Sequence, residues 1–325
     1  MSESKVLIAG ASGYTGALAA RLIHEHPYFT LGAMTSRSDA GVPLSSLYPQ
    51  YRVPGVLEQL ELDRMTEGVA AAIVAYPHGA AAGLVFELLE RGIKVVDLSA
   101  DFRLKDVDVY EDWYVPHPHP ELISEAVYGL TELNRDAIAA ARLVANPGCY
   151  PTATILALAP LVGIQDLVVD AKSGVSGAGR AATAATHFVT VDENITPYKV
   201  ASHRHSPEIE QELGLDGILF TPHLLPLDQG ELVSCYATVA AAPENVHELY
   251  ENFYAAEPFV EVVTHAPGVR EVRDTNFCRI NVRYDTHSRK VIAFGAIDNI
   301  WKGSSSQAVQ NLNLMFGRPE TEGLL

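Results

Sequence analysis

The 325-residue chain is 48% hydrophobic and 19% charged, which is typical of a soluble globular protein, and its length favours two domains over one. With 23 Lys and Arg against 40 Asp and Glu, its net charge of −17 disfavours binding to nucleic acid, which needs basic stripes. The N-terminus has no basic segment followed by a long apolar one. No run approaches the roughly 18 apolar residues of a membrane span, so we predict a cytoplasmic protein.

The N-terminal half begins with a strand, a glycine-rich turn and a helix. Lys5–Ala9 is an apolar run typical of a buried parallel strand, and Thr30–Thr35 is the next such run. Between them, Gly10, Gly13 and Gly16 precede an amphipathic segment. Glycines in this position allow a tight turn and bring a pyrophosphate to the helix N-terminus. The order therefore predicts a dinucleotide-binding site.

The end of the second strand predicts which dinucleotide is bound. NAD sites usually place a carboxylate there for the ribose 2′-hydroxyl, but this chain has Ser36, Arg37 and Ser38. An arginine pairs with a 2′-phosphate, and the serines can donate to it. We predict NADP(H) over NAD(H), although Asp39 stands one residue further on.

Strands and helices continue to alternate through this half. The predicted strands are Ala70–Tyr76, Lys94–Ser99 and Leu143–Ala145, and the predicted helices are Gly79–Arg91 and Asn134–Ala141. Loops at the carboxyl ends of parallel strands bind ligands, which places Pro77 and Arg103 at the predicted site. For Arg103, anion binding and an ordinary surface role are about equally supported by the sequence.

The pattern changes after residue 150, where longer alternating runs appear. They predict an α+β domain with a mixed or antiparallel sheet beside the α/β Rossmann-type domain. The predicted strands are Gly217–Leu224, Glu231–Ala241, Asn276–Tyr284 and Lys290–Ile297; the predicted helices are Tyr150–Leu161, Pro207–Leu213, Glu244–Ala256 and Lys302–Phe316. We predict a nucleotide domain of residues 1–148 and 299–325, to which the last helix returns, and a catalytic and oligomerisation domain of residues 149–298. Long strands also favour a homo-oligomer, a dimer or tetramer.

The three cysteines differ in their surroundings. Cys235 and Cys278 share strand parity with apolar neighbours and are predicted to be core residues. Cys149 lies in Asn-Pro-Gly-Cys-Tyr-Pro-Thr, just before a predicted helix whose N–H groups and positive end would stabilise a thiolate. We predict a nucleophile there. No disulfide and no metal site is expected from three distant cysteines.

A nucleophilic thiol needs an acid or base within reach, and His203 and His205 are the best candidates. They precede Ser206 and Pro207, which are predicted to be the N-cap and first residue of a helix. A surface loop and a zinc site are the alternatives, but further ligands at zinc spacing are lacking. A second glycine- and serine-rich loop, 172–180, could cradle phosphate or approach a nicotinamide. A nicotinamide cofactor and an activated cysteine together indicate chemistry at the aldehyde and acyl level.

Nine segments resemble the N-acetyl-γ-glutamyl-phosphate reductase family and, more distantly, the aspartate-semialdehyde dehydrogenases. They are GASGYTG, YPHG, DLSADFR, YGLTELNR, NPGCYPT, KSGVSGAGR, HRHSPEI, TPHLLPLDQG and DNIWKGSSSQAVQNLNLMFG. The resemblance implies NADPH-dependent reduction of an acyl phosphate, a small-molecule substrate, to a semialdehyde through a cysteine thioester in arginine biosynthesis. It implies Cys149 as nucleophile and His205 as acid and base.

Further roles follow from the same resemblance. It implies that the cofactor loop comprises Gly10, Ser12, Gly13, Tyr14, Thr15 and Gly16, and that Ser176, Gly177 and Asn299 lie near the nicotinamide. The candidates for holding the substrate's phosphate or carboxylate are Arg103, Asn146, Arg180, His203 and Arg204.

The chain departs from the family pattern at two places. Gln229 stands where the family usually has arginine, and Ser304–Ser306 replace a more glycine- and alanine-rich segment. Two other functions stay open: a reductase of carrier-protein-linked aminoadipyl phosphate in lysine biosynthesis, and a non-enzymatic NADP(H)-binding redox sensor. Acidic carriers suit a chain of charge −17 poorly.

Overall fold

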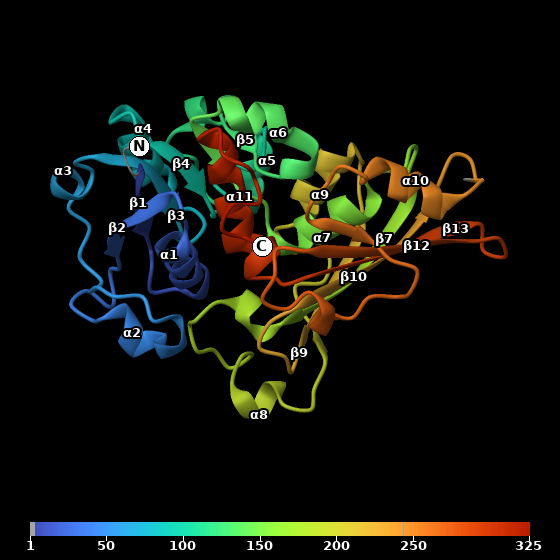
Figure 1. The fold of residues 1–325 in the computed structure, drawn as a ribbon. Helices are drawn as coiled ribbons and strands as arrows, with labels where there is room; N and C mark the ends of the chain where they lie inside the picture. The colour runs from blue at the N-terminus through green and yellow to red at the C-terminus, as the bar shows by residue number, and fades with distance from the viewer. Residues whose placement is uncertain (1–3, 243) are drawn as a thin grey trace. The chain divides into compact units, whose positions relative to one another are not determined.

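The computed structural model describes residues 4–242 and 244–325 and divides into two compact units (Figure 1). The first unit is Met1–Pro147 with Ser304–Leu325, and the second is Gly148–Gly303. The predicted boundary after residue 148 differs from the observed one by one residue, and the predicted boundary after residue 298 differs from the observed one by five. Each unit is described by itself below.

The first unit contains a parallel sheet with the strand order β2-β1-β3-β4-β6-β5. Its strands are β1 (Ser4–Ala9), β2 (Phe29–Thr35), β3 (Val69–Val74), β4 (Lys94–Asp97), β5 (Val127–Tyr128) and β6 (Leu143–Ala145). The chain moves from β1 outward to β2 and then returns to the other side of β1 at β3. This reversal is the place where open α/β sheets bind ligands, at the carboxyl ends of the strands.

Helices connect these strands, as the Rossmann-type prediction requires. They are α1 (Tyr14–Glu25), α2 (Leu44–Leu47), α3 (Leu62–Met65), α4 (Ala82–Glu90), α5 (Val107–Trp113), α6 (Thr131–Ala140) and α11 (Ser306–Met315), with short 3₁₀ turns at Pro49–Tyr51 and Pro120–Leu122. One face of the sheet packs Leu7, Val74 and Val95 against Val85 and Leu88 of α4. Helix α11 contacts α1 and α6, so the C-terminal helix belongs to this unit.

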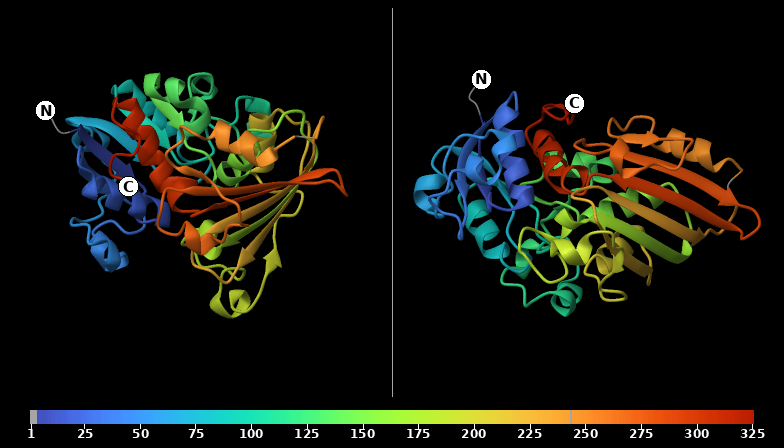
Figure 2. Two further views of the ribbon diagram at one scale, coloured as in Figure 1. Left: turned by 45° about the vertical axis from the view of Figure 1, so that its right-hand side comes forward. Right: turned by 90° about the horizontal axis from the view of Figure 1, so that it is seen from below.

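The second unit contains a mixed sheet with the order β11-β12-β13-β10-β7-β9-β8, whose strands run side by side in Figure 2. Its strands are β7 (Gln165–Gly174), β8 (Thr196–Pro197), β9 (Leu219–Leu225), β10 (Glu231–Thr238), β11 (Val260–Val262), β12 (Cys278–Asp285) and β13 (Lys290–Ile297). The central neighbours β7, β10, β13 and β12 are antiparallel, whereas β9 and β11 join their neighbours in parallel.

Helices pack on one face of this sheet. They are α7 (Cys149–Leu158), α9 (Ser206–Leu213) and α10 (Val246–Phe253), while α8 (Phe188–Val191) lies in the connection before β8, with 3₁₀ turns at Val175–Ala178 and Val269–Glu271. Helix α7 contacts both β10 and β13. The approach is close because Gly295 has no side chain: a Cβ there would come within 2.7 Å of the Ala153 carbonyl oxygen.

The observed elements confirm the predicted fold class, with local corrections. Predicted helix Asn134–Ala141 begins earlier, at Thr131, and Asn134 has non-helical angles inside it. Predicted strand Glu231–Ala241 ends at Thr238, and Ala70–Tyr76 ends at Val74. The last helix begins later than Lys302, because Trp301–Ser305 forms a π-helical turn first. In the described part of the chain, no helix is long and apolar enough to span a membrane.

Candidate active site

The glycine-rich turn of the first unit is built from backbone groups. Gly10 follows β1 with φ of +87°, and a Cβ there would lie 2.5 Å from the Ala75 carbonyl oxygen. A Cβ on Gly16 would lie 2.2 Å from the Gly10 carbonyl oxygen. Gly13 is the N-cap of the twelve-residue helix α1 and offers no side chain to its first N–H groups. The close approach and the open helix end suit a pyrophosphate, so these residues fit a dinucleotide.

The predicted 2′-phosphate residues lie at the end of β2. Arg37 and Ser38 are exposed, and the Arg37 guanidinium lies 5.3 Å from the centroid of the Tyr76 ring. The Asp39 carboxylate accepts hydrogen bonds from Ser38 Oγ at 2.6 Å and Ser36 Oγ at 3.3 Å. Ser36 is buried and also hydrogen-bonds to Ser12 Oγ, so its hydroxyl already has protein partners. Arg37 is therefore the stronger candidate for contact with a 2′-phosphate.

Loops after the next strands contain the other predicted residues of this unit. Pro77 is exposed after β3. Arg103 is 5% exposed and donates to the carbonyl oxygens of Asn146 and Leu98, at 2.7 Å each. Asn146 is fully buried; its amide donates to the Ser304 carbonyl oxygen, and its side-chain oxygen accepts from Asn311. Both side chains donate hydrogen bonds to backbone carbonyl oxygens of loops, and their contact with substrate stays a prediction.

Cys149 is the first residue of α7, half-buried, with Gly148 as the N-cap. The Gly148 amide donates to Glu208 Oε1 of α9 at 2.9 Å, which fixes the turn before the thiol. A Cβ on Gly303 would lie 2.7 Å from the Cys149 Cβ, so the backbone of residue 303 packs directly against this cysteine. A thiol in this position lies beside the positive end of a ten-residue helix.

The other two cysteines confirm the contrast drawn from the sequence. Cys235 in β10 and Cys278 in β12 are fully buried. Burial raises the pKa of the Cys235 thiol well above its usual range. Among the three cysteines, only Cys149 is partly exposed and so within reach of a reagent or substrate.

The two predicted histidines lie in an aromatic cluster with the residue next to Cys149. His205 is half-buried and is the N-cap of α9, one position before the predicted N-cap, Ser206. Its backbone N–H donates to His203 Nδ1 at 3.2 Å. The ring centroid of Tyr150 lies 5.6 Å from that of His203 and 5.8 Å from that of His205. The residue that follows the predicted nucleophile thus packs against both predicted histidines within the second unit.

Glu231 is a residue of this cluster that the sequence interpretation missed. It begins β10, and it is fully buried although charged. Burial raises the pKa of its carboxyl group to about 8, and the Cys149 thiol opposes this rise. The sequence did contain a signal. Glu231 has the same strand parity as Val233 and Cys235, so a charged residue falls on the face of the strand that was assigned to the core.

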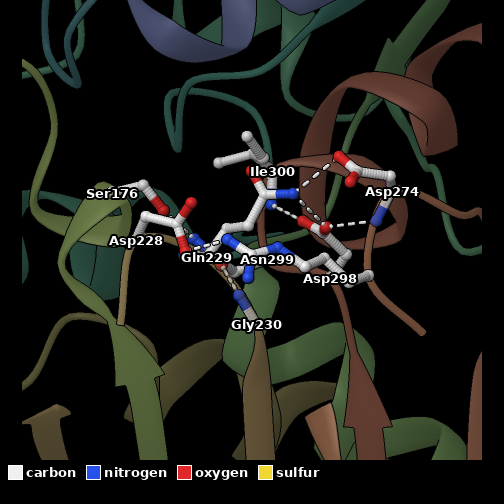
Figure 3. Close-up of polar contacts among 9 residues, drawn as sticks. Ser176, Asp228, Gln229, Gly230, Asp274, Asp298, Asn299 and Ile300 are labelled. Carbon is white, nitrogen blue, oxygen red and sulfur yellow. Dashed lines mark hydrogen bonds and ion pairs between the residues drawn. The ribbon is translucent and has the colours of Figure 1, made fainter. Parts of the chain in front are cut away.

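A polar network joins the turn before β10 to other loops of the second unit (Figure 3). Asn299 accepts a hydrogen bond from the Gly230 amide at 2.7 Å and donates to Ser176 Oγ at 3.0 Å. Gln229 Nε2 donates to Asp298 Oδ2 at 2.9 Å and to Asp274 Oδ1 at 2.7 Å. The network therefore ties the predicted nicotinamide residues Ser176 and Asn299 to the start of β10.

Comparisons with known proteins place the chain in a family. Residues 5–141 match the semialdehyde dehydrogenase NAD binding domain, and residues 149–299 match the semialdehyde dehydrogenase dimerisation domain. Proteins named N-acetyl-gamma-glutamyl-phosphate reductase from Desulforudis audaxviator and Moorella thermoacetica are each 48% identical to it. The first match covers 99% of this chain and 98% of the relative, and the second 98% and 97%. The chain belongs to the N-acetyl-γ-glutamyl-phosphate reductase family.

Members of this reductase family share their fold with another enzyme group. Aspartate semialdehyde dehydrogenase II from Vibrio cholerae, crystallised with a ligand abbreviated ASA, superposes with a TM-score of 0.75 at 19% identity, covering 98% of this chain and 99% of that one. The Candida albicans enzyme, solved with NADP, gives a TM-score of 0.68 at 15% identity, covering 97% and 99%. These structures confirm the fold, and the family match over residues 5–141 makes the first unit the NAD(P)-binding Rossmann-type domain of a dehydrogenase-type oxidoreductase.

The remaining predicted residues lie at more exposed places. Arg180 and Arg204 are exposed in loops of the second unit, and Gly177 is exposed in the 3₁₀ turn Val175–Ala178. At the second departure from the family pattern, Ser305 donates to the Thr15 carbonyl oxygen at 2.8 Å, which joins the start of α11 to the cofactor loop. Among the residues that the structure describes, no group of three His, Cys, Asp or Glu side chains is arranged to hold a metal.

Proposed function

We propose that this chain reduces N-acetyl-γ-glutamyl phosphate with NADPH, releasing phosphate and N-acetylglutamate 5-semialdehyde, as a step of arginine biosynthesis. The observation that carries the proposal is Cys149, a half-exposed thiol at the first residue of α7, in a chain whose relatives bear the name of this reaction. An acyl phosphate needs a nucleophile that forms a thioester, and a thiolate at a helix N-terminus is suited to that role.

Cys149 is assigned the nucleophilic attack on the γ-acyl carbon. The N-terminal amides of α7 point toward a negative charge developing beside the thiol, and the Gly148–Glu208 hydrogen bond keeps the turn in place. Bound NADPH would supply the hydride, held by the backbone of the Gly10–Gly16 turn.

His205 is assigned the proton transfers at the substrate oxygen. Its place as N-cap of α9 fixes its backbone, and the hydrogen bond to His203 restricts the turn that presents its ring. An imidazole can both donate and accept a proton, which suits a group that first donates and later recovers a proton.

Three finer assignments also belong to the proposal. Exposed Arg37 favours NADPH over NADH, because its guanidinium can pair with the 2′-phosphate. The match to a dimerisation domain and the sheet of the second unit favour a homo-oligomer. A soluble biosynthetic substrate and cofactor favour a cytoplasmic location.

The reverse reaction tests the proposal most directly. With N-acetylglutamate 5-semialdehyde, phosphate and NADP⁺, we expect phosphate-dependent formation of NADPH, followed by its absorbance. Cys149→Ser should lower this rate by on the order of ten-thousandfold or more, while NADPH binding stays unchanged. Cys235→Ser, at a fully buried strand position, is the matched control and should keep measurable activity.

The outcomes separate the alternatives. Turnover only with a carrier-linked aminoadipyl substrate would favour the lysine-pathway reaction. NADPH binding with no turnover of either aldehyde would favour the redox sensor. Near-wild-type turnover by Cys149→Ser would contradict the thioester mechanism itself.

A further inference from the structure

Asp101 is a fully buried carboxylate in the loop after β4 of the first unit. Its Oδ1 accepts hydrogen bonds from the Gly79 amide at 2.6 Å and from the Tyr110 hydroxyl at 3.0 Å. Its Oδ2 accepts hydrogen bonds from the amides of Ala81 and Ala82 at 3.0 and 3.1 Å. Because burial of a charge is costly unless donors surround it, these contacts stabilise both the carboxylate and the groups that it binds.

The backbone groups that Asp101 binds belong to the connection between β3 and α4. We call residues 75–81 the β3 loop; Ala82 then begins α4. Residues 77–80 of this loop are exposed, so packing contributes little to their position. A second contact joins the same two loops, because His78 Nδ1 accepts a hydrogen bond from the Ala100 amide at 3.0 Å. The far end of the β3 loop is therefore held by the loop after β4.

The loop that contains Asp101 is itself fixed by hydrogen bonds. The Asp101 amide donates to Ser99 Oγ at 3.0 Å, and Ser99 Oγ donates to Asp97 Oδ2 at 2.6 Å. His117 Nε2 hydrogen-bonds to the Asp101 carbonyl oxygen at 2.7 Å. Ser99 and Asp97 are fully buried. The carboxylate of Asp101 therefore binds the β3 loop from a well-anchored position.

The near end of the β3 loop borders the predicted cofactor residues. A Cβ on Gly10 would lie 2.5 Å from the Ala75 carbonyl oxygen and 3.1 Å from Tyr76 Cδ1. The Arg37 guanidinium lies 5.3 Å from the centroid of the Tyr76 ring. Pro77, another predicted cofactor residue, follows directly in the chain. The position of this loop therefore affects the space beside both the glycine-rich turn and the predicted 2′-phosphate residue.

We propose that Asp101 is a positioning residue of the cofactor site, whose carboxylate fixes the β3 loop where that loop borders the dinucleotide. This inference rests on the proposed binding of NADPH. A carboxylate suits the position because each of its two oxygens accepts two hydrogen bonds here. The side-chain amide of asparagine has one acceptor oxygen and a nitrogen that is itself a donor.

The same carboxylate distinguishes two helices that follow neighbouring strands. The first N–H groups of α4 donate to Asp101, whereas the N-cap of α1, Gly13, offers no side chain to that helix. A phosphate approaching α4 would meet a negative charge, but a phosphate approaching α1 would meet N–H groups. Asp101 therefore also favours α1 as the place where the pyrophosphate binds.

The test is the affinity of Asp101→Asn for NADPH, measured by fluorescence titration without substrate. The amide group turns a donor toward backbone N–H groups, so part of the β3 loop loses its contact. We expect the Kd for NADPH to rise by about tenfold, and the Kd for NADH by the same factor, because the loop borders more than the 2′-phosphate. The kcat at saturating NADPH and the alkylation of Cys149 by iodoacetamide should stay unchanged.

Asp106→Ala is the control for a purely structural role. Asp106 is the N-cap of α5 in the same unit, and its carboxylate accepts from the amides of Asp108 and Val109 at 2.9 and 3.4 Å. Its loss should lower thermal stability, since a helix cap is removed, but should leave the Kd for both cofactors unchanged. An equal loss of affinity in this variant would mean that reduced stability alone weakens binding, and would overturn the proposal.

Unchanged NADPH affinity in Asp101→Asn would also overturn the proposal. If that variant does not fold, hydrogen exchange of the wild-type peptide 77–82, followed by mass spectrometry, decides. Its amides should exchange slowly without cofactor and more slowly with NADPH; fast exchange, or no response to NADPH, contradicts the role of Asp101. A wild-type chain that binds no NADPH would contradict the proposed function as well, whereas normal wild-type binding with an unaffected Asp101→Asn contradicts only this inference.

Discussion

The cofactor turn of the first unit and the Cys149 cluster of the second are built in different ways. The turn consists of seven consecutive residues, and its geometry comes from missing side chains at Gly10 and Gly16. The cluster gathers side chains from α7, the turn before α9 and the start of β10. A site made of backbone is specified locally, whereas a site made of side chains depends on the packing of a whole sheet.

The largest effect is expected when a side chain is added inside the glycine-rich turn, because this tests whether the backbone alone forms the site. In Gly16→Ala, the new Cβ would lie 2.2 Å from the Gly10 carbonyl oxygen, a backbone atom that cannot move without distorting the turn. We expect NADPH affinity, measured by fluorescence titration, to fall by roughly a hundredfold. Alkylation of Cys149 should be unchanged, because its cluster belongs to the other unit.

The control for this change is Gly83→Ala in α4. Apart from the chain neighbours and the backbone of the helix itself, no described atom lies within 4 Å of the Cβ position there, so this variant should bind NADPH normally. Normal NADPH affinity in Gly16→Ala would show that the turn is not the cofactor site.

A smaller effect is expected at the end of β2, where we propose that the Arg37 side chain contacts the cofactor. Arg37→Ala removes an exposed guanidinium beside Tyr76. The KM for NADPH should rise by about tenfold, because its 2′-phosphate loses the guanidinium as a partner. The KM for NADH, which has no 2′-phosphate, should stay the same. Steady-state kinetics with both cofactors measure this.

Arg21→Ala is the matched control for Arg37, since Arg21 pairs with Glu25 on the surface of α1. Its KM for both cofactors should match the wild type. An equal rise for NADPH and NADH in Arg37→Ala would contradict the assignment of Arg37 to the 2′-phosphate.

The same contrast explains how far the sequence could predict each site. The order of β1, the glycine turn and α1 was visible because neighbours in sequence create it. Strand parity separated Cys149 from Cys235 and Cys278 for the same reason. Glu231 interrupts the apolar residues on its face of β10, and this was visible in the sequence. That this position lies near Cys149 of α7 was not visible, because the two residues are 82 positions apart in the chain (231 − 149).

The polar network was beyond prediction for a related reason. Asn299 joins Gly230 and Ser176, which are 69 and 123 residues away along the chain. No local periodicity encodes such pairs. Short elements such as β5 and β8, two residues each, were also missed, because they exist only through pairing with β6 and β9.

The smallest predicted effect concerns Gln229, where the family usually has arginine. Its amide donates to Asp274 and Asp298 but carries no charge to balance them (Figure 3). Burial raises the pKa of Asp298 to about 6, above the usual carboxyl value. Between that usual value and pH 6 the folded state binds more protons than the unfolded state. The contribution of Asp298 to stability therefore declines as pH rises through this window.

Gln229→Arg should reduce that decline, because a guanidinium can pair with both carboxylates and lower the pKa of Asp298. We expect the free energy of unfolding to rise by about 1 kcal/mol at pH 7 and by much less at pH 4, measured by urea denaturation at both pH values. Gln229→Leu removes the donors and should destabilise, more at pH 7 than at pH 4. Glu231 and Asp97 also have raised pKa values, about 8 and 7, so the wild type loses stability over the same range. The decisive quantity is therefore the difference between each variant and the wild type. A difference independent of pH would mean that Gln229 acts on packing, and not on the charge of Asp298.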